Sequence, residues 1–64
     1  MTKEEREQLK ETLYLAGRLS TAAFNVVNCN NIKKLSDRII DLDFAQTNYD
    51  NHVIELLNKY LENE

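Results

Sequence analysis

The sequence predicts an all-α protein: an antiparallel hairpin of two long helices that assembles with further copies into a homo-oligomeric helical bundle. Apolar residues recur at alternating steps of three and four along nearly the whole chain, as they do on one face of a helix. One short polar run, 28–31, interrupts this pattern, so we expect two helices and one turn. With 64 residues the chain forms one small domain, which usually needs a partner subunit, a metal or disulfides for stability.

The first helix is expected over residues 3–27. Thr2 and Glu5 have the spacing of a capping box, in which each side chain accepts a backbone N–H that the first turn leaves unpaired. Glu4 and Glu7 add negative charge near the positive end of the helix dipole. The row expected to face the second helix consists of Leu9, Leu13, Ala16, Ser20, Ala23 and Val27.

The turn is expected at 28–31 and the second helix at 32–61. Asparagine side chains can end one helix and cap the next, and so short a turn makes the two helices antiparallel neighbours. We interpret Gln46 as a buried polar residue that fixes the register between helices, and His52 as a rim residue. The row expected to face the first helix consists of Ile32, Leu35, Ile39, Leu42, Gln46, Tyr49, Val53, Leu56 and Tyr60.

Residues 47–52 are all poor helix formers, which favours a break followed by a short third helix. The apolar heptad nevertheless continues from Leu42 through Tyr49 to Leu56 without a shift, and a loop would normally disrupt it. We therefore expect one second helix, straight or kinked near 47–52.

Both helices carry more apolar residues than a two-helix hairpin can cover, so another surface must bury the excess. We expect self-association, with a four-helix dimer as the simplest arrangement and a larger ring, such as a hexamer, as the next. The second apolar rows are Leu15, Leu19, Ala22 and Val26 in the first helix and Ile40, Phe44, Ile54, Leu57 and Leu61 in the second.

The composition disfavours several classes of protein. No apolar run reaches the roughly 18 residues of a membrane span, and the amino terminus lacks a secretory signal, so we expect a cytoplasmic protein. Cys29 and His52 are the single cysteine and histidine, and they predict no internal disulfide, metal site or cofactor. They lie too far apart in one hairpin to form a nucleophile and its base, so we expect no enzyme. A net charge of −3 disfavours duplex DNA.

Basic residues gather in the middle of this acidic chain, where 12–40 carries four bases and one acid. The start of the second helix combines free backbone amides, asparagines and cations, which favours a bound phosphate or carboxylate. The alternative is a solvated face whose cations pair with Asp37 and Asp41. The candidate anion ligands here are Lys33, Lys34 and Arg38.

A second candidate site lies on the first helix, where Lys10, Tyr14 and Arg18 repeat at steps of four and place two cations beside an aromatic ring. Such a row can hold a phosphate while a base stacks on the ring. The alternative is a tyrosine that packs over a subunit boundary.

The run 44–57 resembles the second-helix signature of phage hairpin proteins that sequester immune cyclic nucleotides. The places of that signature are filled by Ala45, Thr47, Tyr49, Val53, Ile54 and Leu56. The resemblance implies a homo-oligomeric sponge, often hexameric, that binds messengers of CBASS or related antiviral systems between subunits. It carries over Thr47 as a ligand residue, whereas His52 and Glu55 depart from the pattern.

The opening run 1–3, followed by Glu5 and Leu9, and the position of the turn resemble the Rop-type plasmid hairpin dimers that bind RNA. The RNA-binding face implied by this resemblance consists of Lys10, Tyr14, Arg18 and Asn25.

We therefore expect a non-enzymatic protein that sequesters a small anionic nucleotide signal and so blocks host antiviral immunity. Eight asparagines and no proline fit a compositionally biased source such as a phage. The alternatives are a helical inhibitor or adaptor that docks on a host protein, and a Rop-like RNA-binding dimer.

Overall fold

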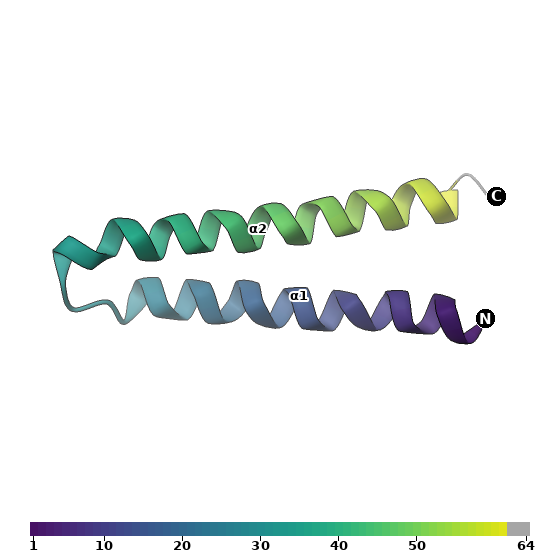
Figure 1. Cartoon of the computed structure of the whole chain (residues 1–64), viewed down its shortest axis with the longest axis horizontal. Coiled ribbons are helices and arrows are strands. Elements are labelled where there is room, and N and C mark those ends of the chain that lie inside the picture. Colours follow the sequence, from purple (N-terminus) through teal and green to yellow (C-terminus); the bar gives the residue numbers. More distant parts are fainter. Residues whose placement is uncertain (62–64) are drawn as a thin grey trace.

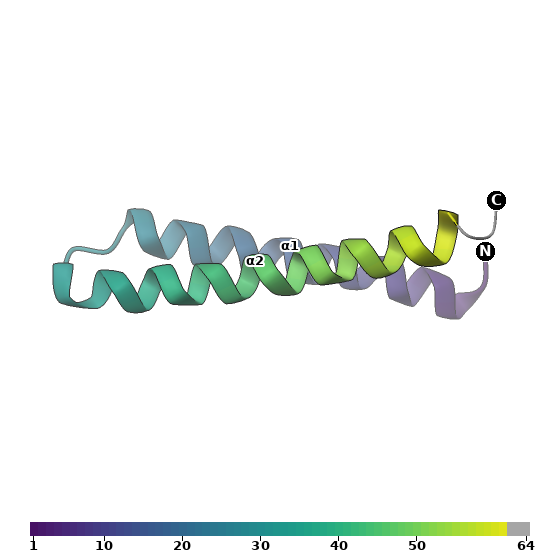
Figure 2. The same cartoon turned by 90° about the horizontal axis from the view of Figure 1, so that it is seen from above.

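A computed structural model of this protein describes residues 1–61, which form two antiparallel helices joined by a short turn (Figure 1). Helix α1 spans Lys3–Val27 and helix α2 spans Ile32–Leu61. The part of the chain that is described contains no strand. The helices cross when the hairpin is seen from above, and α1 begins at the end where α2 finishes (Figure 2). The expected all-α hairpin is confirmed, while its assembly into a larger bundle stays a prediction.

The first turn of α1 is closed by the capping box expected from the sequence. The backbone N–H of Thr2 donates to Glu5 Oε1 over 2.9 Å, and the backbone N–H of Glu5 donates to Thr2 Oγ1 over 3.1 Å. The hydrogen bond from the Thr2 backbone, and then that with its side chain, lowers the pKa of the Glu5 carboxyl below its ordinary value. Both partners thus satisfy N–H groups that the helix cannot pair itself.

Asparagine side chains end α1 and begin α2, as expected. Asn28 Nδ2 donates to the carbonyl oxygen of Phe24 over 2.9 Å, which satisfies an orphan acceptor of the last turn of α1. Asn31 Oδ1 accepts the backbone N–H of Lys33 over 2.9 Å and so caps α2. The Cys29 thiol donates to the Asn31 carbonyl oxygen over 3.3 Å.

Helix α2 is continuous through residues 47–52, so the alternative of a short third helix is wrong. The poor intrinsic propensity of these residues costs a few tenths of a kcal/mol each, about 0.5 on typical scales. Two residues of this segment, the half-buried Tyr49 and the buried His52, pack toward α1 and hold the segment in helical register.

The face of α1 that packs on α2 differs from the sequence prediction. The row expected to point outward is half-buried along the hairpin: Leu15, Leu19, Ala22 and Val26. Two members of the row expected to point inward, Leu13 and Val27, are instead 77% and 82% exposed. Both rows follow the same three-and-four spacing, so spacing alone could not separate them. In the middle of α1 the row that packs on α2 has Leu15 and Leu19 where the other row has Ala16, Ser20 and Ala23, so the larger apolar side chains lie against α2. Two members of the other row, Leu9 and Ala16, are also half-buried, as expected.

The prediction for α2 is correct in part. The half-buried members of the expected row are Leu35, Leu42, Tyr49, Val53, Leu56 and Tyr60. However, Ile32, Ile39 and Gln46 are exposed, so Gln46 is not a buried polar residue of the hairpin. The buried polar residue is instead His52, which is 8% exposed and therefore does not lie at the rim as expected.

The buried contact across the hairpin is polar. The Thr12 hydroxyl and His52 Nε2 are hydrogen-bonded over 2.8 Å. Nearer the open end, Lys59 Nζ donates to Gln8 Oε1 over 2.9 Å. We call the residues between the helices the hairpin seam: Thr12, Leu15, Leu19, Ala22 and Val26 of α1, with Leu42, Ala45, Tyr49, His52 and Leu56 of α2.

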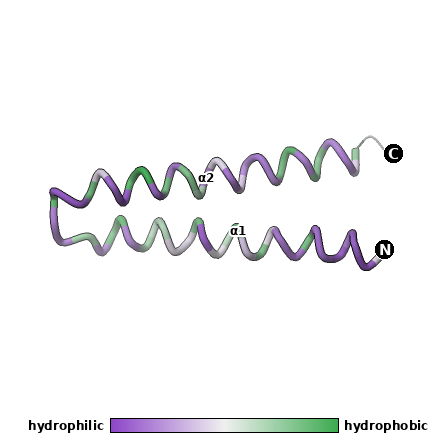
Figure 3. Tube along the Cα trace, in the orientation of Figure 1, coloured by the Kyte–Doolittle hydropathy of each residue, from purple (hydrophilic) through white to green (hydrophobic). Residues whose placement is uncertain are grey.

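The seam leaves most of the apolar surface uncovered. Within residues 1–61 only Ala45 and His52 are buried. Hydrophobic residues recur along α2 and the turn-proximal part of α1, whereas the start of α1 is hydrophilic (Figure 3). The exposed excess expected on α2 is present in the single chain: Ile40, Phe44, Ile54, Leu57 and Leu61 are each at least half exposed. A two-helix chain with so small a core is marginal on its own.

Candidate functional site

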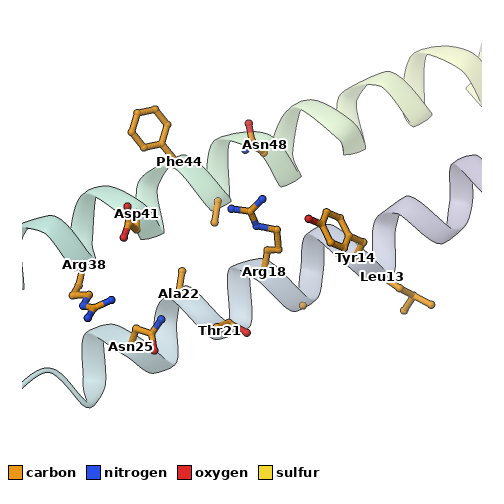
Figure 4. A pocket seen from close by; sticks show the side chains of 12 residues that line it. Leu13, Tyr14, Arg18, Thr21, Ala22, Asn25, Arg38, Asp41, Phe44 and Asn48 are labelled. Carbon is orange, nitrogen blue, oxygen red and sulfur yellow. The ribbon is translucent and has the colours of Figure 1, made fainter.

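An open groove of about 810 Å³ runs along one side of the hairpin, between the facing edges of α1 and α2 (Figure 4). We call it the arginine groove. It is lined by Leu13, Tyr14, Gly17, Arg18, Thr21, Ala22 and Asn25 of α1 and by Arg38, Asp41, Phe44, Ala45 and Asn48 of α2. The side chains of Leu13 and Phe44 point away from the space between the helices, so polar groups and small residues form most of its wall (Figure 4).

The heptad places the polar side chains of the groove. On α1, Arg18 and Asn25 lie seven residues apart, each immediately before a seam residue. On α2, Asp41 and Asn48 have the same separation and the same relation to the seam. In an antiparallel pair, positions that precede the seam on both helices meet along one edge. These four residues therefore line a common groove although they come from both halves of the chain.

Small residues keep the floor of the groove open. Ala22 and Ala45 belong to the seam and line the groove, and neither side chain can reach across it. At Gly17 a methyl group would find no other heavy atom within 4 Å, so the wall is open there as well. The volume lies within the range of small-molecule sites, about 300 to 1,000 Å³.

Two guanidinium groups with no ion-pair partner among the described residues face this space. Arg18 extends from α1 into the gap, and Arg38 extends from α2 toward Asn25 (Figure 4). The ion pair found in residues 1–61 lies elsewhere, between Lys10 Nζ and Glu7 Oε1 at 3.6 Å. Arginine presents planar, paired N–H donors that match phosphate or carboxylate oxygens.

The two arginines lie at different levels of the groove. The Thr12 and His52 contact sets the antiparallel register, so Arg38 lies opposite Val26, about one heptad from Arg18 along α1. Eight residues of helix correspond to about 12 Å. The Asp41 carboxylate lines the groove as well, as an acceptor that a base amino group could use.

The structure brings together part of the sequence-predicted site. Tyr14, Arg18 and Arg38 all line the arginine groove. Lys34 lines, with Arg38, a smaller hollow of about 210 Å³ beside the turn. The expected pairing of turn cations with Asp37 and Asp41 is not found among the described ion pairs.

Three predicted site residues lie outside both hollows. Lys10 pairs with Glu7, so of the two cations expected around Tyr14 only Arg18 has no ion-pair partner in the part of the chain that the structure describes. Lys33 uses its backbone N–H in the Asn31 cap, and its side chain lines no hollow that the structure describes. Thr47 is exposed on α2 and likewise lines none.

Sequence reasoning did not single out Asp41 and Asn48 as candidate site residues, although both line the groove. The signal that could have found them is their heptad spacing on one side of the α2 seam, which matches that of Arg18 and Asn25 on α1. Using it requires knowing which row of α1 faces α2, and that assignment was wrong.

His52 lines a second hollow of about 400 Å³ on the same side of the hairpin, together with Glu11, Asn48 and Glu55. Its Nε2 is held by Thr12, and Cys29 lies in the turn, remote from it along α2. Within the described residues, no cluster of three or more histidine, cysteine or acidic side chains could hold a metal ion. The groups gathered here suit binding through hydrogen bonds and charge.

Neither described helix combines the length and the apolar character needed to cross a membrane. Comparison of this chain with family models, with curated proteins and with solved structures finds no match in any of the three. The resemblances to the cyclic-nucleotide sponges and to the Rop-type dimers therefore stay expectations, and the function is argued from the groove.

Proposed function

We propose that this protein binds a small anionic nucleotide in the arginine groove and sequesters it without chemical change. The observation that carries the proposal is a pair of guanidinium groups, Arg18 and Arg38, which have no ion-pair partner within residues 1–61 and which two different helices direct into one open groove. Charge-assisted hydrogen bonds from arginine are about twice as strong as neutral ones and select planar oxygen pairs. A phosphate is one of the two anions that such donors match in geometry.

The other groups of the groove favour a nucleotide over a free phosphate. The Tyr14 ring offers an apolar face on which a base can stack, a contact worth about 1 to 3 kcal/mol in nucleic-acid complexes. Asn25 and Asn48 supply amide donors and acceptors for base edges, and Asp41 supplies an acceptor for an exocyclic amino group. Asn25 and Asp41 lie between the levels of the two arginines, whereas Tyr14 and Asn48 lie beyond Arg18 (Figure 4).

The spacing of the cations favours a ligand with two anionic groups. A mononucleotide presents one phosphate and would use Arg18 or Arg38, whereas about 12 Å of helix separates their levels. A cyclic dinucleotide or a related molecule carries two phosphates with bases beside them. We therefore propose a cyclic oligonucleotide of this kind as the ligand class, which agrees with the sponge resemblance of the run 44–57. In that role the protein withholds the signal from a host antiviral effector.

The same geometry weighs against the two alternatives. The RNA-binding face expected from Lys10, Tyr14 and Arg18 loses a free cation, because Lys10 pairs with Glu7. An acidic chain with a single groove also offers little surface for the many phosphate contacts that an RNA duplex requires. Docking on a host protein would use the exposed apolar residues rather than the groove.

The test is a thermal-shift and calorimetric titration of the purified chain against cyclic di- and trinucleotides, cyclic ADP-ribose products, mononucleotides and uncharged nucleosides. A ligand that binds the folded state raises Tm in proportion to its excess over Kd. We expect a shift with a two-phosphate ligand, a Kd at least about tenfold weaker for its mononucleotide, and none for nucleosides. Absence of any shift across the panel at high concentration would contradict the proposal.

Matched variants assign the binding to the groove. R18Q and R38Q each remove one groove cation and should weaken binding about tenfold or more, since a hydrogen bond to a charged group is worth about 1.5 to 3 kcal/mol. K33Q removes a cation that lies five residues before Arg38 on the same helix but outside the groove, and should leave Kd within about twofold. Equal losses in R38Q and K33Q would mean that diffuse charge, and not the groove, attracts the ligand.

A further inference from the structure

The side of the hairpin opposite the arginine groove is apolar. On α1, Leu9, Ala16 and Ala23 each follow a heptad position that faces α2, whereas Arg18 and Asn25 precede one. Residues that follow the seam and residues that precede it lie on opposite sides of a helix pair. On α2, Gln46 and Val53 directly follow the seam residues Ala45 and His52, and Ile39 lies one heptad before Gln46. We call these six residues the apolar face.

We propose that a second copy of this chain covers the apolar face, with the turns of both copies at the same end. The two copies then form a four-helix bundle in which α1 of each lies on α2 of the other. The arginine grooves stay on the two outer sides of this dimer.

The charge distribution separates this face from the rest of the surface. None of its six residues is charged, although 30% of the whole chain is. The exposed Val27 and Leu57 flank it, one on each helix. Exposed apolar patches of this extent, bordered by polar residues, mark interaction sites.

The small core of the single hairpin favours a second copy of the chain as the partner that covers the apolar face. Only Ala45 and His52 are buried in the described chain, so the fold itself depends on whatever covers the apolar face. A second copy is present wherever the protein is made and presents the same face. Twofold symmetry lets one patch pair with itself.

The area agrees with a dimer. The hairpin measures 48 × 19 × 12 Å, so each broad side has a footprint of 48 × 19 Å. A standard interface buries about 800 Å² of each partner, which is close to one such side. Full coverage of the apolar face would thus supply an interface of ordinary size.

The position of the acids on α2 sets the orientation. Asp43 and Asp50 lie at equal distances from the midpoint of Ile32–Leu61 and share one edge of the apolar face. If the turns lay at opposite ends, α2 would pack on α2 of the partner, and Asp43 of one copy would meet Asp50 of the other. Like charges placed opposite each other destabilise a pairing. With the turns at the same end, both acids meet α1, which has no acid from 12 to 27.

Gln46 gains a role in this arrangement. It lies at the middle of α2, close to the level of Ser20 on the opposite helix, so both polar residues fall near the centre of the interface. A single polar layer in an apolar helical interface fixes register and the number of helices. The register function expected of Gln46 inside the hairpin thus belongs between copies.

The native Cys29 tests both the dimer and its orientation. It lies in the turn and is the single cysteine, so a spin label there reports one distance per dimer. Sedimentation of the labelled and unlabelled chain should show a dimer, and the distance between the two Cys29 labels should be well below the 48 Å length of the hairpin. A monomer at every concentration overturns the proposal, and a label distance near the full hairpin length overturns the orientation.

Two matched isoleucines locate the interface. Ile39 lies on the apolar face and is 49% exposed in the single chain, while Ile54 lies on the outer side of the same helix and is 53% exposed. I39E should raise the dimer Kd about a hundredfold, because it buries a charge twice in one symmetric interface. I54E should leave the dimer Kd within about threefold. Equal effects of the two variants would place the interface elsewhere. If I39E unfolds, the label distance measured on the wild type still tests the dimer and its orientation.

The proposed dimer and the proposed nucleotide site can be refuted independently of each other. Loss of the dimer with retained nucleotide binding would refute this inference and leave the proposed function in place. A stable dimer that binds no member of the nucleotide panel would do the reverse. If both proposals hold, titration should reach two ligands per dimer.

Discussion

The two broad sides of this hairpin flank the same seam but differ in charge and polarity. One side carries two arginines, two asparagines and an aspartate around an open groove, and all of these except Arg38 directly precede a seam residue. The other side carries no charge among the six residues of the apolar face, which Asp43 and Asp50 border. A change of two residues along a helix thus separates a surface suited to a polar ligand from one suited to another helix pair. On so small a protein, function depends on which side of the seam a residue falls.

The largest effect is expected when the same positive charge is introduced on each side in turn and the stabilities of the two variants are compared. Gln46 and Asn48 are two residues apart on α2, on the apolar face and in the groove respectively. We expect Q46K to destabilise the assembled protein by about 2 to 3 kcal/mol, because it buries unpaired charges in the interface. N48K should change stability by no more than about 0.5 kcal/mol.

Urea denaturation at several protein concentrations measures this pair of variants, and nucleotide titration adds a second readout. N48K introduces a third cation into the groove and should tighten binding of a two-phosphate ligand by severalfold. If N48K destabilised the protein as much as Q46K, the two sides would not differ in the way proposed.

The next largest effect concerns the polar contact inside the seam. T12V removes the hydroxyl that is hydrogen-bonded to His52 at 2.8 Å, so the imidazole loses this partner. H52L removes the imidazole, so the Thr12 hydroxyl loses its partner. Each single variant should lose about 1 to 2 kcal/mol, the usual cost of a buried polar group without its partner. The double variant should lose clearly less than the sum, because it removes both groups. Additive losses in urea denaturation would show that the two side chains do not depend on each other.

A smaller effect, of opposite sign, is expected at Gly17. Glycine costs about 1 kcal/mol relative to alanine within a helix, and a methyl group here would meet no atom within 4 Å. G17A should therefore raise the free energy of unfolding by about 0.5 to 1 kcal/mol. Because Gly17 lines the wide groove and not the apolar face, dimer Kd and ligand Kd should both stay within about twofold. A clear weakening of the dimer would show that the second copy approaches this part of α1.

The smallest effect concerns the capping box, far from both sides. The folded protein lowers the pKa of Glu5 through its hydrogen bonds with Thr2, so the stabilisation is present above the ordinary pKa of 4.5 and is lost as pH falls through the lowered value. Thermal unfolding followed by circular dichroism between pH 7 and pH 3 should show this loss in the wild type. The loss should be smaller in E5Q, which keeps an acceptor that does not titrate. E4Q, which changes the neighbouring charge outside the capping box, should behave as the wild type.

The structure confirms the local features that were predicted from the sequence. The capping box, the asparagine turn and the continuous α2 follow from short-range chemistry, in which the interacting groups lie within about four residues of each other. The excess of apolar residues was also visible, because counting rows requires no knowledge of which row faces which. Three of the seven candidate site residues, Tyr14, Arg18 and Arg38, were found from their charge and spacing and line one groove.

The failures have two causes. Leu13 was placed inside the hairpin and Leu15 outside it, and Gln46 and His52 exchanged roles for the same reason. Lys10 was counted as a free cation although Glu7 lies within reach. Each error concerns the rotation of a helix about its own axis or the choice among neighbouring partners, which a repeating pattern leaves open.

The sequence by itself therefore determined the helices, their ends and the amount of apolar surface, because these depend on period, caps and composition. Only the tertiary structure decided which row of α1 faces α2, because two rows with the same period compete and the packing of Leu15 and Leu19 against α2 selects between them. That choice then brings Arg18 and Arg38 to one side and leaves Ile39 and Gln46 on the other. The groove and the apolar face are thus both consequences of a single rotation, which long-range packing sets and local spacing does not.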